Sequence, residues 1–320
     1  MSSNLGFRSV DCNLVYIYFA FVGKSSVGPL SLCSTSPFQL KAIMLKQLSR
    51  SLFSNLFDSQ SFRDKAIFHL KQYYYHELGI VVDLGNGYTC PIADPAARYS
   101  FAEIFFDNEY SNVFEEINLP SKWLDLGCHY GFFTLYVSWM RGKQLLSSDF
   151  QALMVDADSR VLPGISSLVK LNNLEPHVSF LHGAIASGSG SVDFIEQEVM
   201  SSALADLPSE SVQYSTSKVP IVDQSMILDA ILPPYDLVKI DVEGGEYDFF
   251  LSYEKILSAT HNLVVEWHSW HRGGGSSIQI QELATSYGFQ LKKVIKPPTP
   301  CGDPVIGNHV GVYLFSKPEI

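Results

Sequence analysis

The sequence contains two stretches with the same order of parts: an apolar run, then acids and glycines, then apolar residues at helical spacing. The first stretch begins at Trp123 and includes Gly127 and Gly131, and the second runs from Tyr235 to Glu246. A strand that leads through glycines into a helix is typical of parallel α/β sheets, which bind ligands at the carboxyl ends of their strands. Two such junctions in one chain therefore predict a ligand site at a switch point of the sheet.

From residue 121 onward, strand and helix patterns alternate. Short apolar runs predict strands over 122–125, 152–156, 178–182, 237–241, 263–267, 290–295 and 310–315. Helical spacing between the runs predicts helices over 132–140, 159–171, 246–258 and 276–287. The last two strands are joined by a polar loop without a helical pattern, so we expect them to be antiparallel. The predicted fold class is α/β: a Rossmann-like, seven-stranded, mostly parallel sheet with an antiparallel last strand and helices on both faces.

Residues before 121 show no regular alternation. Helical spacing predicts helices over 37–57 and 61–76. Residues 80–92 contain Asn86-Gly87 between two β-rich runs, which is the strongest short-range signal for a hairpin. We therefore predict three parts: a poorly defined N-terminal extension over 1–36, N-terminal helices and a β-hairpin cap over 37–120, and the α/β domain over 121–320.

Composition excludes several classes of partner. The net charge is −11 and no stretch is rich in Lys and Arg, so we expect no nucleic-acid partner. The apolar run at 14–22 is too short to cross a bilayer, which argues against stable membrane insertion. The five cysteines lie far apart without a CxxC pair. That spacing fits reduced thiols in a cytoplasmic protein better than a disulfide framework or a zinc site.

The first junction carries an acid where dinucleotide sites carry none. Asp125 ends a predicted strand, and Gly127 and Gly131 permit a tight turn before the next helix. In a Gly-x-Gly-x-x-Gly site, an acid at this place would repel the pyrophosphate of the dinucleotide. An acid suits a cofactor with an ammonium group and a sulfonium, so we infer S-adenosyl-L-methionine. Asp125, both glycines and the intervening Tyr130 are our candidates for cofactor contacts.

The next two strands offer groups for the rest of this cofactor. Asp156 at the tip of the second strand can accept hydrogen bonds from both ribose hydroxyls, each worth about 1.5–3 kcal/mol. Ala157 follows it as a further contact, and Asp158 is better placed to cap the next helix. Gly183 and Ala184 end the third strand and are small enough for an adenine ring to lie flat on the backbone, although a simple turn explains them equally well.

The fourth strand carries the most distinctive motif. Residues 239–246 read Lys-Ile-Asp-Val-Glu-Gly-Gly-Glu and resemble the Lys-Ile-Asp-Val-Glu-Gly-x-Glu signature of FkbM-type S-adenosylmethionine-dependent methyltransferases. Residues 124–134 resemble that family's Asp-x-Gly-x-x-x-Gly-x-x-(Thr/Ser) motif, and 263–268 resemble its apolar strand that ends in Glu. Residues 101–110 are similar to the segment that precedes its first strand. The likeness covers residues 101–315 in matching order.

The sequence departs from the family pattern at two places. Asp156-Ala157 stands where the family has Glu-Pro, so a shorter carboxylate must sit closer to the ribose. Cys128, His129 and Tyr130 replace the small residues that are usual between the two glycines.

The resemblance implies a class I methyltransferase fold and methyl transfer to an oxygen of a sugar, glycan or secondary metabolite. A hydroxyl acceptor needs a base that takes its proton as the new bond forms. The catalytic candidates are Asp241 and Glu243 at the end of the fourth strand and His268 just beyond the fifth, with either His268 or Asp241 as the base. Asp241 is also a candidate for cofactor contact. We assign no metal, although Asp241, Glu266 and His268 together are a conceivable ligand set.

Two other functions stay open at this point. One is a nicotinamide-dependent oxidoreductase, against which the position of Asp125 argues. The other is a cofactor-binding or regulatory module without activity. The oligomeric state and the identity of the acceptor, a small molecule or a glycan, are not determined by the sequence.

Overall fold

The computed structural model describes residues 80–92, 95–196, 215–270, 275–300 and 308–318. The helices predicted over 37–57 and 61–76, and the extension before them, lie outside these residues. The described residues belong to one compact unit, which begins at Ile80.

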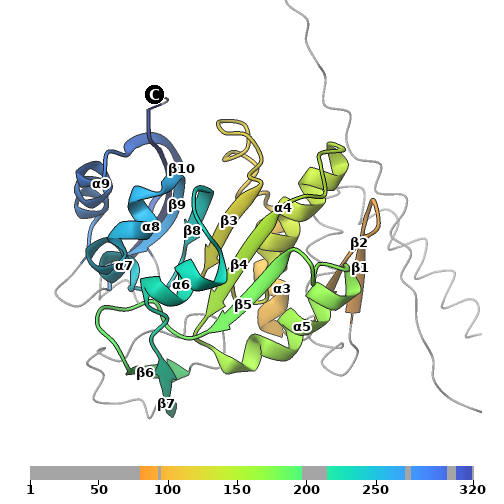
Figure 1. The fold of residues 1–320 in the computed structure, drawn as a ribbon, viewed down its shortest axis with the longest axis horizontal. Helices are drawn as coiled ribbons and strands as arrows, with labels where there is room; N and C mark the ends of the chain where they lie inside the picture. The colour runs from red at the N-terminus through yellow and green to blue at the C-terminus, as the bar shows by residue number, and fades with distance from the viewer. Residues whose placement is uncertain (1–79, 93–94, 197–214, 271–274, 301–307, 319–320) are drawn as a thin grey trace, which may run out of the picture. The chain divides into compact units, whose positions relative to one another are not determined.

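A seven-stranded sheet with the order β10-β11-β9-β8-β3-β4-β5 forms the centre of this unit (Figure 1). Its strands are β3 (Lys122–Leu126), β4 (Gln151–Asp156), β5 (Val178–His182), β8 (Tyr235–Ile240), β9 (Thr260–His268), β10 (Gln290–Pro300) and β11 (His309–Ser316). Strands β5, β4, β3, β8 and β9 pair in parallel. Strand β11 is antiparallel to both of its neighbours. The predicted sheet, with its antiparallel last strand, is confirmed.

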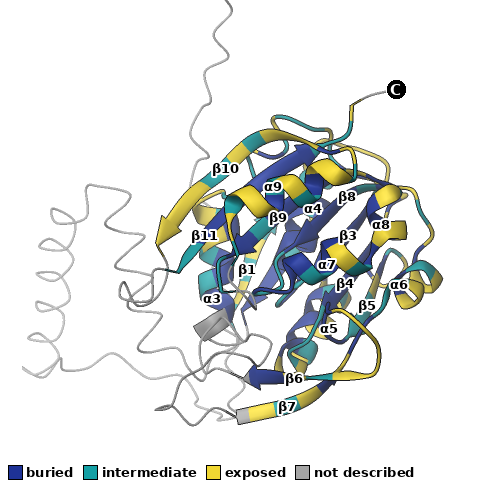
Figure 2. Cartoon of the chain, turned by 90° about the vertical axis from the view of Figure 1, so that its left-hand side faces the viewer, coloured by how far each residue is buried: buried dark blue, intermediate teal, exposed yellow. Residues whose placement is uncertain are grey.

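Helices cover both faces of the sheet, so that the buried strands lie between exposed helix surfaces (Figure 2). The helical segments are α3 (Pro95–Phe101), η2 (Ala102–Phe106), α4 (Phe132–Lys143), η3 (Ser159–Val161), α5 (Leu162–Leu171), α6 (Gln224–Ala230), α7 (Glu246–Ser252), α8 (Glu254–Ser258) and α9 (Ser277–Ser286). Strand residues alternate between two cores: Trp123 and Leu237 pack with α4, whereas Leu124 and Val238 pack with α7. None of the helices in the described ranges is both long enough and apolar enough to cross a membrane.

The predicted hairpin is confirmed as β1 (Ile80–Gly85) and β2 (Tyr88–Ile92). Its turn residues have positive φ, 55° at Asn86 and 82° at Gly87, as a tight hairpin turn requires. Cys90 and Ile92 are buried in the same core as the residues of α4, so the hairpin packs directly on the α/β domain.

Several boundaries differ from the prediction. Strand β9 extends to His268, so this histidine is the last residue of a strand rather than part of the following loop. The helix predicted over 246–258 is broken at Tyr253, whose hydroxyl donates to the Val222 carbonyl at 2.7 Å. Two short strands that are not among the predicted ones, β6 (Ser191–Glu196) and β7 (Ser215–Pro220), pair antiparallel outside the central sheet. The residues between these strands are not described.

Gly127 brings the end of β3 into direct contact with the end of β8. Its φ is +71°, and a Cβ atom at this position would lie 1.6 Å from the carbonyl oxygen of Asp241. The glycine is therefore required both by the backbone conformation and by the neighbouring chain. It holds the two loops that form the centre of the carboxyl edge.

Replacing Gly127 with alanine should lower the free energy of unfolding by more than about 3 kcal/mol. The positive φ alone costs about 1–2 kcal/mol, and the overlap with Asp241 adds to it. The control is Gly188→Ala, because Gly188 also has a positive φ, +97°, but has no atom within 4 Å of its would-be Cβ. Urea denaturation measures both variants. Equal losses would show that the contact with Asp241 is unimportant.

Candidate active site at the carboxyl edge of the sheet

Polar side chains gather on one face of the sheet where β3, β8 and β9 end. Asp125, Lys239 and Glu266 alternate along their strands with residues of the core that contains α7, so they point to the opposite side, the one that faces α4. Strands β3 and β8 are neighbours in the sheet although their successors in the chain lie on opposite sides. This is the switch point at which open α/β sheets bind ligands.

Lys239 is a buried cation that links this edge. Its side chain is 5% exposed, and its Nζ lies 3.1 Å from Asp241 Oδ2 and 3.5 Å from Asp125 Oδ1. It also donates to the Gly127 carbonyl at 2.7 Å. Burial alone would lower the pKa of Lys239, but the charges of Asp241 and Asp125 raise it above its ordinary value.

Asp125 lies in the protein interior, next to Lys239. It is fully buried, and it accepts a hydrogen bond of 2.8 Å from the Thr134 hydroxyl in the first turns of α4. Burial raises the pKa of Asp125, and the charge of Lys239 opposes that rise. The carboxylate therefore ties β3 to both α4 and β8. Direct contact between Asp125 and the cofactor stays a prediction.

In the glycine loop after β3, the Tyr130 side chain lies in the core, whereas the His129 backbone N–H points toward Asp156. Tyr130 is 4% exposed, and its ring packs against Gly164 of α5. Gly131, at φ +78°, is the N-cap of α4 and provides no side-chain cap for the helix. Cys128 is buried, as expected of a packing residue. The cofactor contact predicted for Tyr130 stays a prediction, and the structure places its side chain in the protein interior.

Asp156 is bound to the backbone through both oxygens. Oδ2 accepts from the His129 N–H at 2.6 Å, and Oδ1 accepts from the Asp158 N–H at 2.8 Å. Burial raises the pKa of this carboxyl group to about 7, and the two backbone hydrogen bonds oppose the rise. Asp158 caps the next helical turn by accepting from the Arg160 N–H at 2.9 Å, as predicted. Each Asp156 oxygen retains capacity for a further hydrogen bond.

The end of β5 is fixed by the chain that follows β7. The Ala184 N–H donates to the Pro220 carbonyl at 2.8 Å, and the Val222 N–H donates to the Ala184 carbonyl at 3.0 Å. A Cβ on Gly183 would lie 2.6 Å from the Pro220 oxygen, so the small residue is required here by the protein's own packing. Ala157 packs beside Ala184 in a small apolar cluster. The adenine contacts predicted for Gly183 and Ala184, and the cofactor contact predicted for Ala157, stay predictions.

His268 lies between two glutamates. Its side chain is 3% exposed, its Nδ1–H donates to Glu246 Oε1 at 2.8 Å, and its Nε2 lies 3.6 Å from Glu243 Oε2. Burial alone would lower the pKa of His268, but the two carboxylates raise it well above its ordinary value. Glu246 is itself fully buried and accepts from the N–H groups of Val242 and Gly244. Glu246 therefore fixes both the loop after β8 and the orientation of the histidine ring.

Glu243 occupies a strained backbone position at this loop. Its φ is +52°, which is uncommon for a residue other than glycine. Its Oε2 is buried without a hydrogen-bond partner among the described residues, and burial raises the pKa of the carboxyl group to about 7. Ligand atoms of Asp241, Glu243 and His268 all lie within 4.8 Å of one another. The structure thus brings the three predicted catalytic residues together.

Sequence reasoning missed a second charged group beside this trio. Lys296 of β10 lies 3.6 Å from Glu109 Oε1 and 4.0 Å from Glu266 Oε1. Tyr110 is buried next to Glu109 and packs on Phe133 of α4, with ring centroids 4.9 Å apart. Glu109 and Tyr110 lie in the segment 101–110 that resembles the family, so this resemblance could have identified them as site residues. Lys296 follows an ordinary strand pattern and offered none.

The residues at the ends of β3 and β4 fit the predicted cofactor. The uncapped N-terminus of α4 offers backbone N–H groups to a carboxylate. The half-buried Asp156 offers acceptor oxygens to ribose hydroxyls, and Asp241 is the member of the trio that Lys239 links to the β3 end. S-adenosylmethionine has a carboxylate, a ribose and a methyl-bearing sulfonium, which these groups can bind in that order.

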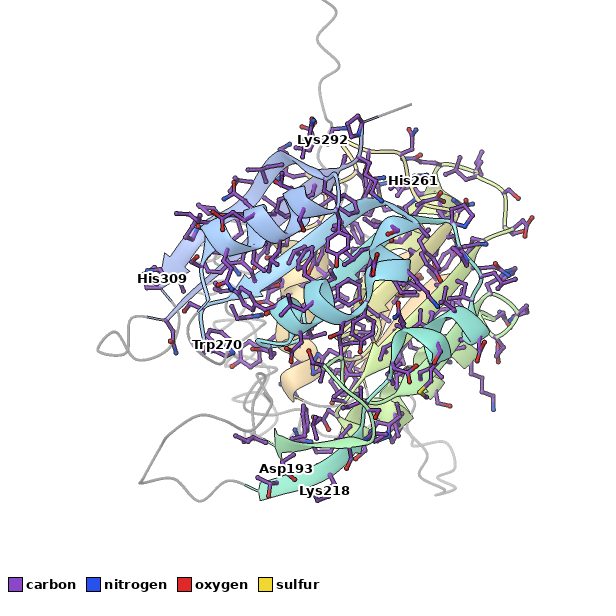
Figure 3. The ribbon with its side chains drawn as sticks, turned by 60° about the vertical axis from the view of Figure 1, so that its left-hand side comes forward. Asp193, Lys218, His261, Trp270, Lys292 and His309 are labelled. Atoms are coloured by element: carbon purple, nitrogen blue, oxygen red, sulfur yellow. The ribbon has the colours of Figure 1, made fainter. Side chains whose placement is uncertain are left out.

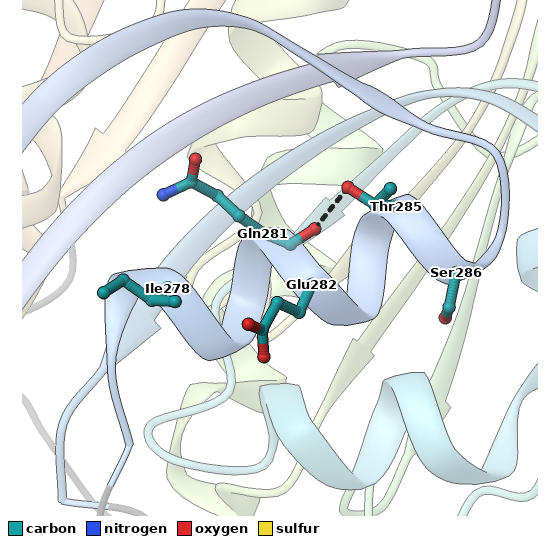
Figure 4. Close-up of a pocket in the computed structure, with 5 residues that line it drawn as sticks. All are labelled: Ile278, Gln281, Glu282, Thr285 and Ser286. Carbon is teal, nitrogen blue, oxygen red and sulfur yellow. Dashed lines mark hydrogen bonds between the residues drawn. The ribbon is translucent and has the colours of Figure 1, made fainter.

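A hollow on α9 is a different feature (Figure 4). It is lined by residues of that one helix, Ile278, Gln281, Glu282, Thr285 and Ser286. The Thr285 hydroxyl donates to the Gln281 carbonyl at 2.7 Å, as is common for threonine within a helix. Of the described residues, Glu282 is the one ionisable residue that lines the hollow, and no second element brings a functional group toward it. We therefore assign no chemistry to this hollow.

Replacing Lys239 with methionine should lower the free energy of unfolding by about 3–5 kcal/mol, because the fully buried Asp125 and the half-buried Asp241 lose their cation. The control is Lys218→Met, which breaks an ion pair with Asp193 on the β6–β7 hairpin (Figure 3). Both of those side chains are mostly exposed, 73% and 59%, so this loss should stay within about 1 kcal/mol. Urea denaturation at neutral pH measures both. Similar values for the two variants would contradict a central role for Lys239.

Comparison with known proteins places the chain in a family. Residues 131–291, just over half of the 320, match the family described as Methyltransferase FkbM domain. No curated protein sequence matches the chain significantly. The O-methyltransferase from Bacillus cereus in complex with SAH is 12% identical, with 85% of this chain and 97% of that chain covered and a TM-score of 0.38. Magnesium protoporphyrin IX methyltransferase from Synechocystis with bound SAM is 10% identical, with 84% and 97% covered and a TM-score of 0.41. At this distance, neither structure informs individual site residues. The family match establishes that the chain belongs to the FkbM family of S-adenosylmethionine-dependent methyltransferases.

Proposed function

We propose that the protein transfers the methyl group of S-adenosylmethionine to a hydroxyl of a sugar, a glycan or a secondary metabolite. The observation that carries this proposal is the convergence of Asp241, Glu243 and His268 within 4.8 Å at the carboxyl edge. Hydroxyl acceptors need groups that orient the oxygen and help remove its proton, and carboxylates with a histidine are suited to both tasks. The bound cofactor supplies the electrophilic methyl group.

The cofactor side of the site is formed by β3, β4 and α4. We assign the ribose to Asp156 and the methionyl carboxylate to the N-terminus of α4 after Gly131. We assign the adenine to the end of β5, where Gly183 and Ala184 carry no large side chain. In this assignment Asp125 and Tyr130 do not contact the cofactor. They hold the glycine loop in place, Asp125 through Thr134 of α4 and Tyr130 through its packing on Gly164 of α5.

The acceptor side is formed by the loop after β8 and the end of β9. Lys239 holds Asp241 by its Oδ2, and Glu246 holds His268 by its Nδ1. Glu243 has an oxygen without a partner among the described side chains and is the group most available to an acceptor. These fixed positions favour a near-attack arrangement of the acceptor oxygen and the methyl group.

Membership of the FkbM family favours S-adenosylmethionine over the nicotinamide dinucleotide considered as an alternative. A cytoplasmic location is also part of our proposal, and the free buried thiols of Cys90 and Cys128 are consistent with it.

The affinity for S-adenosylmethionine should rise from about pH 6 to about pH 8, because the pKa of Asp156 is about 7 and the ionised carboxylate is the better acceptor of two hydroxyls. Asp156→Asn should weaken binding by about 10- to 100-fold and flatten this dependence. Calorimetry between these pH values measures both effects. Asp158→Asn is the control, since Asp158 caps a helical turn, and it should leave the affinity nearly unchanged. A pH-dependent affinity that survives in Asp156→Asn would contradict the assignment.

Release of S-adenosylhomocysteine in the presence of hydroxyl-bearing sugars tests the reaction itself. Glu243→Gln should lower kcat by about 10²- to 10⁴-fold while the affinity for S-adenosylmethionine stays the same. Serine substitution of the exposed Glu254 on α8 is the control and should leave kcat unchanged. Methylation of amines but of no hydroxyl would refute the acceptor class. If the protein binds S-adenosylmethionine tightly but releases no S-adenosylhomocysteine with any acceptor tested, that result would instead support a non-catalytic module.

A further inference from the structure

We propose that Asp241, Glu243 and His268 bind a divalent cation, with Mn²⁺ as the representative ion. This inference rests on the proposed function in one respect only: it assigns the ion to the acceptor side of the same site. It departs from the sequence-based expectation that no metal is bound.

The ligand atoms converge from two elements. Asp241 and Glu243 lie in the loop after β8, and His268 ends the neighbouring strand β9. Their ligand atoms lie within 4.8 Å of one another. An ion at about 2.1 Å from each ligand needs these atoms about 3 Å apart. The half-buried carboxylates can close this gap by side-chain rotation, while the buried ring stays fixed.

The histidine is oriented as a metal ligand would be. Its Nδ1–H donates to Glu246 Oε1 at 2.8 Å, which directs Nε2 toward Glu243 and Asp241. A carboxylate on the second ring nitrogen is the usual partner of a metal-binding histidine. Nε2 makes no hydrogen bond to any described residue, since its 3.6 Å distance to Glu243 Oε2 is too long for one.

Glu243 supplies a second, independent observation. Its Oε2 is buried without a hydrogen-bond partner in the described part of the chain. A buried carboxylate oxygen without a partner is costly, and an ion in this position removes the cost. The left-handed backbone at Glu243, φ +52°, turns this residue toward His268, and such strain is typical of functional sites.

The sequence-based ligand set differed from this one by a single residue. It contained Glu266, which the structure instead places near Lys296, 4.0 Å from its Nζ. Glu266 is close enough to contribute charge but does not belong to the converging trio. It is therefore a matched control for the effect of negative charge alone.

One imidazole and two carboxylates suit a borderline divalent ion such as Mn²⁺ better than Ca²⁺, which takes oxygen ligands only. Three protein ligands leave coordination positions open for an acceptor hydroxyl. An ion at this place would lower the pKa of the bound hydroxyl, whose proton would pass to water. The oxygen–methyl bond would form as the sulfur–methyl bond breaks, and S-adenosylhomocysteine would be the leaving group.

The test is a titration of the metal-free full-length protein with Mn²⁺. The electron paramagnetic resonance signal of the free ion measures how much Mn²⁺ remains unbound at each step. Asp241→Asn, Glu243→Gln and His268→Gln should each weaken Mn²⁺ binding by at least about 10-fold, whereas Glu266→Gln should change it by less than about threefold. Urea denaturation shows that each variant is folded. Equal weakening by Glu266→Gln and Glu243→Gln, or no binding below about 1 mM, would overturn the proposal.

Tryptophan fluorescence locates the ion. The ring centroids of Trp270, labelled in Figure 3, and His268 lie 4.4 Å apart, so bound Mn²⁺ should quench the emission of Trp270. Trp270→Phe should remove most of this quenching without changing the affinity for Mn²⁺. Quenching that persists fully in Trp270→Phe would place the ion elsewhere and refute the site.

Two outcomes separate this inference from the proposed function. Methylation that continues undiminished in a chelator, with no Mn²⁺ binding, would end the metal proposal and leave the methyltransferase assignment intact. Mn²⁺ binding that depends on the trio, in a protein that methylates no hydroxyl, would support the metal site and contradict the acceptor class.

Discussion

The carboxyl edge of this sheet depends on one buried cation. Lys239 contacts Asp125, Asp241 and the Gly127 carbonyl at once, with 5% of its side chain exposed. A buried ammonium group is stable only with such compensation, and the acids in turn need the cation. The same contacts place the glycine loop after β3 beside the acids that follow β8. In the proposed assignment, this single interaction positions the binding sites of both the methyl donor and the acceptor.

A second buried carboxylate has the corresponding role at the loop after β8, the proposed acceptor side. Glu246 accepts from two backbone N–H groups of its own loop and from His268. The loop after β8 is therefore held at both ends, by Lys239 on Asp241 and by Glu246. Glu243 lies between these fixed points with a left-handed backbone and a buried oxygen without a partner among the described residues. A rigid frame around one unsatisfied group is what an ion site or a catalytic site requires.

Local patterns in the sequence predicted the sheet, the Asn86-Gly87 hairpin and the Asp158 cap, because spacing and turn chemistry act over a few residues. They also led to Asp241, Glu243 and His268, through the motif of the fourth strand and the end of the fifth. They did not predict the contact of Lys296 with Glu109, whose partners lie far apart in the chain. Nor did they predict that Asp125 and Tyr130 would be buried, since the helix and loop that cover them are placed by tertiary packing.

The central claim is that acids at the tips of neighbouring strands divide the site into a cofactor side and an acceptor side. A crystal structure with S-adenosylhomocysteine tests it most directly. We expect the ribose hydroxyls on Asp156, the carboxylate at the N-terminus of α4, and the sulfur facing Asp241. A ribose bound to Glu243 and His268 instead, with Asp156 free of the ligand, would contradict the account.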